Sequence, residues 1–285
     1  MSNIEVSKII DPIPASDGAG VKLKRSIGVE PNYFDPFLML DEFGSENSED
    51  YIAGFPPHPH RGIETVTYML AGDFEHKDST GGEGRMTAGD VQWMTAGSGI
   101  LHQEFHSDAF AKQGGIFQMV QLWVNLPAKH KMTPPTYQEI LSQNIPEIQL
   151  SNSSGSIRVI AGEHEGQVGP AKTFTPMNVF DIRLKKGEEL VLPAPNGWNA
   201  SVVVLRGALE SAGERGAVAQ DAKMLIFSQD GQDIKVKALE DTVALLLSGE
   251  PIAEPIVGYG PFVMNTREEI NQAISDFNQG VFGSI

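Results

Sequence analysis

Cysteine is absent from the 285-residue chain. This absence excludes disulfide bonds, thiolate nucleophiles and thiolate metal ligands, so any metal must be held by nitrogen and oxygen atoms. Basic residues are also scarce: 21 Lys and Arg face 37 Asp and Glu, which leaves a net charge of −16, and the longest basic run is Lys22-Leu23-Lys24-Arg25. Because such a surface repels nucleic-acid phosphates, we expect no direct contact with nucleic acid.

Long hydrophobic runs are missing as well. No stretch of about 18 apolar residues occurs, so the sequence predicts no membrane span. The first residues, MSNIEVSKIIDPIP, lack the basic start and the apolar run of a secretion signal. We therefore expect a cytoplasmic protein, or a nuclear one if the source is eukaryotic.

The chain contains instead many short apolar segments, each bounded by Gly, Pro, Asn or Asp. Thr65–Leu70 ends just before Gly72, and Phe117–Leu126 alternates between two sets of side chains. Period-two alternation, β-branched residues and glycine punctuation are typical of strands in a barrel or a sandwich. The sequence therefore predicts an all-β fold.

One helix is predicted near the C-terminus, over about residues 266–279. Thr266 and Glu269 have the spacing of a capping box. An apolar stripe at helical spacing follows, formed by Ile270, Ala273, Ile274 and Phe277. We expect this helix to pack across a barrel. A weaker helix signal covers Tyr137–Leu141.

The strands fall into two groups, separated by a segment rich in proline and serine over residues 127–156. We expect an N-terminal domain over residues 1–138 and a C-terminal domain over residues 139–285 that ends in the helix. Val66–Phe74 and Ser201–Leu209 resemble each other at an offset of 135 residues. This repeat indicates one small barrel used twice.

Two short motifs carry metal-binding side chains. His58-Pro59-His60 and His102-Gln103-Glu104 each place two such side chains at positions i and i+2. Alternate residues of a strand face the same way, so each pair points into one cavity. Two such pairs on neighbouring strands would bring three nitrogens and one oxygen together, a set that suits Fe, Mn, Co, Ni, Cu or Zn.

Other residues near these motifs admit two interpretations. Glu64 has the parity of the same face and is a competing ligand, a salt-bridge partner of Arg61 or a group that orients a histidine. His76 and His106 either support the site from outside the ligand set or, as is usual for lone histidines in polar loops, lie in solvent.

His130 and His164 are expected at the surface. Met119 and Trp123 are expected in the core rather than in the wall of the pocket. The candidates for an apolar wall around the metal are Phe55, Met69, Trp93 and Phe105.

Residues 54–72 resemble the first motif of the cupin superfamily, with His58, His60 and Glu64 between two glycines. The second motif departs from that superfamily, because Thr95 replaces the usual proline and His102 comes two residues late. Those departures are shared with the pirins. The segments that resemble pirin hallmarks are 58–66, 89–104, 122–126 and 260–266, and the resemblance runs from about residue 20 to the C-terminus.

The resemblance implies two jelly-roll-like cupin barrels with one mononuclear divalent metal, usually Fe(II), in the N-terminal barrel only. The implied ligands are the four residues that the spacing selects: His58, His60, His102 and Glu104. Glu64 then lies outside the ligand set. An offset of 135 residues from the first histidine pair reaches Pro193 and Pro195, which supports a metal-free C-terminal barrel.

Some pirins resemble quercetin 2,3-dioxygenase, which opens a flavonol ring with dioxygen and releases carbon monoxide. The resemblance thus implies a flavonol-like aromatic substrate and O₂, with Glu104 as the candidate base for the substrate hydroxyl. The alternative that it implies is an iron-dependent, redox-sensing co-regulator that binds a protein partner without turnover. A storage-like or vestigial cupin is a third reading. The resemblance favours a monomer.

Overall fold

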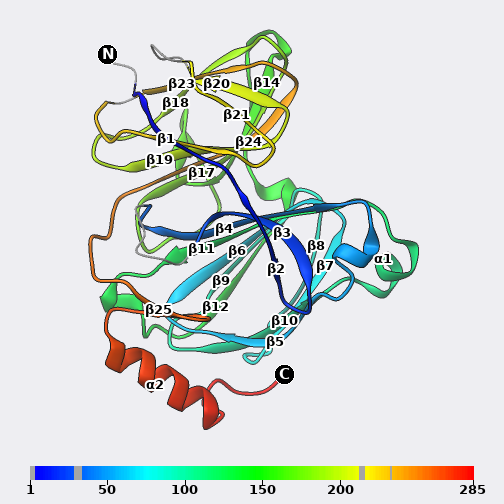
Figure 1. The fold of residues 1–285 in the computed structure, drawn as a ribbon, viewed down its shortest axis with the longest axis vertical. Coiled ribbons are helices and arrows are strands. Elements are labelled where there is room, and N and C mark those ends of the chain that lie inside the picture. The colour runs from blue at the N-terminus through cyan, green and yellow to red at the C-terminus, as the bar shows by residue number, and fades with distance from the viewer. Residues whose placement is uncertain (1–3, 29–33, 212–215, 232) are drawn as a thin grey trace. The chain divides into compact units, whose positions relative to one another are not determined.

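The computed structural model describes residues 4–28, 34–211, 216–231 and 233–285. The chain forms two compact units, each with one seven-stranded and one four-stranded antiparallel sheet (Figure 1). We call Pro14–Ser142 together with Ile252–Ile285 the N-terminal barrel, and Met1–Ile13 together with Gln143–Pro251 the C-terminal barrel. The predicted all-β class is confirmed, because strands dominate and the described residues contain only two α-helices.

The N-terminal barrel encloses a core that includes Phe43, Met69, Phe74 and Phe117. Its large sheet has the order β12 (Thr136–Ile140), β9 (Val91–Thr95), β6 (Ile63–Ala71), β11 (Phe117–Asn125), β4 (Phe37–Ser45), β3 (Val21–Ile27) and β2 (Ile13–Asp17). Its small sheet has the order β5 (Phe55–His60), β10 (Ile100–Phe105), β7 (Asp73–Asp78) and β8 (Glu83–Thr87). Its short helical elements are η1 (Ser48–Asp50), α1 (Asp108–Gln113) and η2 (Ala128–His130).

The C-terminal barrel repeats this plan around an aliphatic core. Its large sheet has the order β1 (Val6–Ile10), β22 (Met224–Phe227), β19 (Asn199–Arg206), β24 (Thr242–Gly249), β17 (Met177–Leu184), β14 (Gly155–Ala161) and β13 (Glu147–Gln149). Its small sheet has the order β18 (Glu189–Pro193), β23 (Asp233–Ala238), β20 (Ala208–Ser211) and β21 (Val218–Gln220). The remaining elements are η3 (Ser142–Asn144), η4 (Ser151–Ser153), β15 (Glu163–His164) and β16 (Gln167–Val168).

The two terminal segments belong to different barrels from those the domain ranges predict. The break inside the chain, between Ser142 and Gln143, lies near the predicted division between 138 and 139. Strand β1, however, pairs with β22, with Val6 opposite Phe227, and Ile252–Ile285 belongs to the N-terminal barrel. A strand pattern shows that a segment will pair, but it does not show which sheet edge the segment will join.

The predicted C-terminal helix is confirmed as α2 (Arg267–Asn278), the red helix of Figure 1. The Thr266 hydroxyl accepts the Glu269 N–H at 3.2 Å, and the Glu269 carboxylate accepts the Thr266 N–H at 2.9 Å. The buried face of the helix, which includes Ile270, packs in one cluster with residues of β25 (Val257–Tyr259) and β26 (Phe262–Met264).

The weaker helix prediction, over Tyr137–Leu141, is wrong. Thr136–Ile140 forms β12, which pairs with β9 at the edge of the large sheet. A five-residue segment cannot repay the cost of starting a helix, whereas the edge of β9 offers it a full ladder of backbone hydrogen bonds.

A buried lysine fastens the C-terminal segment to its barrel. Lys131 is 1% exposed. Its ammonium group donates to three oxygens: Gly62 O at 2.8 Å, Asn125 Oδ1 at 2.7 Å and Val263 O at 2.9 Å. The group thus bridges the start of β6, the end of β11 and β26.

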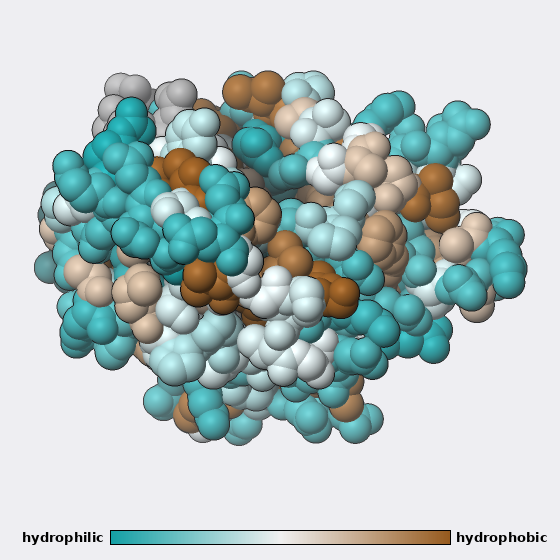
Figure 2. All heavy atoms as spheres, turned by 90° about the horizontal axis from the view of Figure 1, so that it is seen from below, coloured by the Kyte–Doolittle hydropathy of each residue, from teal (hydrophilic) through white to brown (hydrophobic). Residues whose placement is uncertain are grey.

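One face of the molecule can be inspected for exposed apolar residues. The face in Figure 2 is mostly hydrophilic, with hydrophobic residues in small groups. Among the helices of the described chain, none has the length and apolar character that crossing a membrane would require.

Candidate metal centre

Three neighbouring strands of the small sheet bring the candidate ligands together. Strand β10 lies between β5 and β7. His102 faces His58 on β5, and Glu104 faces His76 on β7. Along β10 the buried and half-buried residues alternate, so His102 and Glu104 both point inward. The two motifs therefore lie on adjacent strands.

The side chains form two overlapping clusters. One ring nitrogen from each of His58, His60 and His102 lies within 4.8 Å of the others, and the ring centroids of His58 and His102 are 4.2 Å apart. A second cluster combines His76, His102 and Glu104, whose ligand atoms also lie within 4.8 Å of one another. His102 belongs to both clusters and links the histidine pair of β5 to Glu104 and His76.

Burial keeps the histidines neutral. It lowers the pKa of His58, and it lowers the pKa values of His60 and His102 well below the ordinary value. A neutral imidazole is the form that binds a metal ion. Burial also raises the pKa of Glu104 to about 7, because the carboxyl group lies wholly inside the barrel.

Two buried atoms in the cluster have no partner. Within the part of the chain that the structure describes, His102 Nε2 and Glu104 Oε2 make no hydrogen bond. Unpaired polar atoms inside a protein are costly, so their retention calls for a ligand. The Nδ1–H of His58 donates to Pro56 O at 2.8 Å, which leaves its Nε2 lone pair available. The donor set therefore fits a divalent metal bound by nitrogen and oxygen.

Comparison with known families covers both barrels. The pirin family model matches residues 20–124, and the model of the pirin C-terminal cupin domain matches residues 179–283. The chain belongs to the pirin family. The fold of this pirin is accordingly that of two cupin domains with a short C-terminal helix, as the resemblance implied.

Close relatives span nearly the whole chain. A Pseudomonas aeruginosa protein named as a candidate quercetin 2,3-dioxygenase is 47% identical over 275 residues, which cover 93% of each chain. A pirin-like protein of Caulobacter vibrioides is 43% identical over 280 residues, covering 97% of this chain and 98% of its own. The crystal structure of a quercetin 2,3-dioxygenase from Acinetobacter baumannii is 44% identical, covers 100% of both chains and has a TM-score of 0.93.

Glu64 lies apart from both clusters of this pirin. Its Oε1 accepts the Thr95 hydroxyl at 2.8 Å, and the Trp93 indole also faces the carboxyl group. Burial raises the pKa of Glu64 to about 7. The predicted salt-bridge partner, Arg61, instead pairs with Asp276 at 2.8 Å.

The expectation that His76 and His106 lie in solvent is wrong. His76 is 1% exposed, and its Nε2 lies 3.0 Å from Asp78 Oδ2. His106 is also buried, with a backbone carbonyl oxygen 3.0 Å from each ring nitrogen. A polar strand such as β7 lacks the apolar alternation that reveals a strand, so the segment reads as a loop. His130 and His164, expected at the surface, are half-buried.

A pocket of about 530 Å³ opens at the first histidine pair. His58 and His60 lie in its wall. Its apolar lining includes Met39, Phe55 and Trp123, and its polar lining includes Arg25 and Gln121. This volume falls within the range of small-molecule sites.

The predicted wall is only partly the observed one. Phe55 lines the pocket, but Met69 and Trp93 are wholly buried in the barrel, and Phe105 does not border the pocket. Met119 and Trp123 are buried in the core, as expected, but Trp123 also lines the pocket and meets the His60 ring edge-on at 5.1 Å between centroids. The spacing of Trp123 in the sequence does not indicate that it lies on the large sheet beside the histidines.

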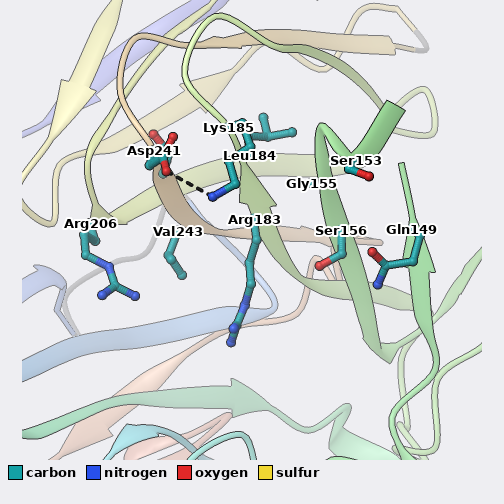
Figure 3. A pocket seen from close by; sticks show the side chains of 11 residues that line it. Gln149, Ser153, Gly155, Ser156, Arg183, Leu184, Lys185, Arg206, Asp241 and Val243 are labelled. Atoms are coloured by element: carbon teal, nitrogen blue, oxygen red, sulfur yellow. Dashed lines mark hydrogen bonds and ion pairs between the residues drawn. The ribbon is translucent and has the colours of Figure 1, made fainter. Parts of the chain in front are cut away.

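The C-terminal barrel offers different pockets. Within its described residues, no His, Asp and Glu side chains gather closely enough to share a metal ion. One pocket is lined by Pro193 and Pro195, the positions that the repeat aligns with the histidine pair. Another pocket is lined by Arg183, Lys185 and Arg206 (Figure 3). In its wall the Lys185 Nζ forms an ion pair with Asp241 Oδ2 at 3.1 Å.

Proposed function

We propose that this pirin is a metal-dependent dioxygenase that opens the ring of a flavonol with O₂, as a quercetin 2,3-dioxygenase does. The observation that carries the proposal is the histidine cluster: His102 Nε2 has no partner among the described residues, and His58 and His60 of the same cluster line a pocket large enough for an aromatic substrate. The names of two relatives at 44% and 47% identity support the same activity.

The proposed ligands of one divalent metal are His58, His60, His102 and Glu104. Iron(II) is the metal we propose, although Mn, Co, Ni, Cu and Zn accept the same nitrogen and oxygen donors. When bound, the metal supplies a Lewis acid for the adjacent hydroxyl and carbonyl oxygens of a flavonol and a redox centre for dioxygen.

Glu104 is the proposed base. In the metal-free protein burial raises the pKa of Glu104 to about 7, so a carboxylate released from the metal would take a proton from the flavonol hydroxyl near neutral pH. The Gln92 amide donates to Glu104 Oε1 at 3.2 Å, which leaves Oε2 to bind the metal or, once released from it, to receive that proton.

The pocket lining supports an aromatic substrate. Met39, Phe55 and Trp123 provide apolar faces for a flavonol, and Gln121 offers an amide to its hydroxyl groups. An apolar wall also excludes water from reactive intermediates.

The test is dioxygen uptake on adding quercetin to iron-reconstituted protein, with bound iron quantified in the same sample. We expect uptake that scales with bound iron and is lost in His102→Ala. His164→Ala, which removes a histidine of the C-terminal barrel, is the matched control and keeps the activity. Stoichiometric iron without uptake above that of free iron would refute the enzyme and favour the redox-sensing interaction protein.

A further inference from the structure

Behind the proposed ligands, β7 contributes two buried side chains. His76 and Asp78 are 1% and 5% exposed and lie directly opposite Glu104 and His102 on β10. Neither belongs to the proposed ligand set. The hydrogen bonds around them determine where each proton sits.

Asp78 fixes the proton of His76. Asp78 Oδ1 accepts from the Thr80 N–H at 2.7 Å, the Thr80 hydroxyl at 2.6 Å and the Gly82 N–H at 3.1 Å, which marks the group as a carboxylate. Its other oxygen, Oδ2, lies 3.0 Å from His76 Nε2. Since a carboxylate only accepts, His76 carries its proton on Nε2 and a lone pair on Nδ1.

The lone pair of His76 faces two donors. Gln92 Nε2 lies 3.2 Å from His76 Nδ1, and its other hydrogen goes to Glu104 Oε1, also at 3.2 Å. The Tyr137 hydroxyl donates to Gln92 Oε1 at 3.3 Å, which fixes the orientation of the amide. His102 Nδ1 lies 3.5 Å from His76 Nδ1, and we expect it to carry a hydrogen, because two facing lone pairs would repel.

The network thus touches one atom of each ligand on β10 and leaves the other free. His102 Nδ1 and Glu104 Oε1 face the network, whereas His102 Nε2 and Glu104 Oε2 are the two unpartnered atoms. We propose that Asp78, His76 and Gln92 are positioning residues that hold His102 as its Nδ1–H tautomer and turn Glu104, so that both free atoms present lone pairs to the metal. This inference rests on the proposed function only in taking those atoms as ligands.

Nitrogen NMR of the metal-free, full-length protein labelled with ¹⁵N-histidine tests the tautomers directly. We expect His76 protonated on Nε2 and His102 on Nδ1. A proton on His102 Nε2 would overturn the proposal. Because this NMR measurement needs neither flavonol nor metal, its result tests the tautomers independently of the dioxygenase activity.

Asp78→Asn should invert the network. The three donors at Oδ1 keep the amide oxygen on their side, so the new NH₂ group faces His76 and drives the His76 proton from Nε2 to Nδ1. His102 must then carry its proton on Nε2, the ligand atom. The trypsin-type catalytic triad shows the same effect when its aspartate becomes asparagine.

The second readout is zinc affinity, measured by competition with a chelator. We expect Asp78→Asn to weaken zinc binding about 10- to 100-fold. Lys77→Gln is the matched control, because Lys77 lies between His76 and Asp78 on the exposed face of β7 and should change neither tautomers nor affinity. An Asp78→Asn protein with unchanged tautomers and affinity would overturn the inference. So would a zinc-induced shift of a His76 nitrogen, which would make His76 itself a ligand. If Asp78→Asn does not fold, the wild-type spectrum alone decides.

Discussion

Acid should weaken metal binding in proportion to the protonation of a single carboxyl group. Burial places the pKa of Glu104 at about 7 in the metal-free protein, well above its ordinary 4.5. Below pH 7 the proton must leave before the carboxylate can bind a metal, so affinity is full above that pH and falls as the pH drops through it.

The magnitude follows from the pKa. At pH 5, two units below about 7, removing the proton costs about 2.7 kcal/mol, which is about a hundredfold in affinity. A glutamate with its ordinary pKa would cost only about 0.2 kcal/mol at that pH. Burial also lowers the pKa values of His58, His60 and His102, which favours the neutral imidazoles and leaves Glu104 as the main source of the slope.

Zinc affinity measured by chelator competition from pH 5 to pH 8 checks this. We expect about a tenfold loss for each pH unit below 7. Glu104→Gln should bind more weakly but without that slope, whereas Glu64→Gln should keep it, since Glu64 contacts Thr95 and not the cluster. Affinity that stays constant down to pH 5, or a slope of two protons, would refute the assignment. Circular dichroism at each pH confirms that the protein is folded.

Three further outcomes are expected. Trp123→Ala, which removes the ring beside His60, should raise KM for quercetin while bound iron stays constant; an unchanged KM would exclude Trp123 from the substrate site. Lys131→Met should lower the free energy of unfolding by about 3–5 kcal/mol in urea titrations, because three buried oxygens lose their donor, and a loss below 1 kcal/mol would contradict its structural role. Thr266→Ala should cost about 1 kcal/mol through loss of the helix cap, and Thr266→Ser should restore it.

Much of the site could be predicted because strand geometry is local. His58 and His60, and His102 and Glu104, share a face by period two alone. The same signal was present in His76-Lys77-Asp78, a histidine and a carboxylate at i and i+2, but a polar strand without apolar neighbours reads as a loop. Gln92 has no such signal, because a lone amide acquires meaning only from the groups that face it.

For the fold, too, the local features could be predicted from the sequence and the long-range ones could not. The capping box and the apolar stripe predicted α2 to within two residues of its observed ends. Both signals arise between residues that are close in the sequence, so they can be recognised without the tertiary structure. The barrel that each terminal segment joins depends on partners far away in the sequence, as in the pairing of Val6 with Phe227. No local pattern carries that choice, and Trp123 likewise meets the histidine pair only through the packing of two sheets.

The N-terminal barrel is completed by the last segment of the chain, Ile252–Ile285, and this determines when its pocket can form during translation. The histidines leave the ribosome early, but Pro261, which lines their pocket and offers its carbonyl to His60 Nδ1 at 3.4 Å, follows about two hundred residues later. The same late segment brings Val263 to Lys131 and Asp276 to Arg61. A nascent chain that ends at residue 251 therefore carries all four proposed ligands but an unfinished pocket, so the pocket closes only after the whole C-terminal barrel has been translated.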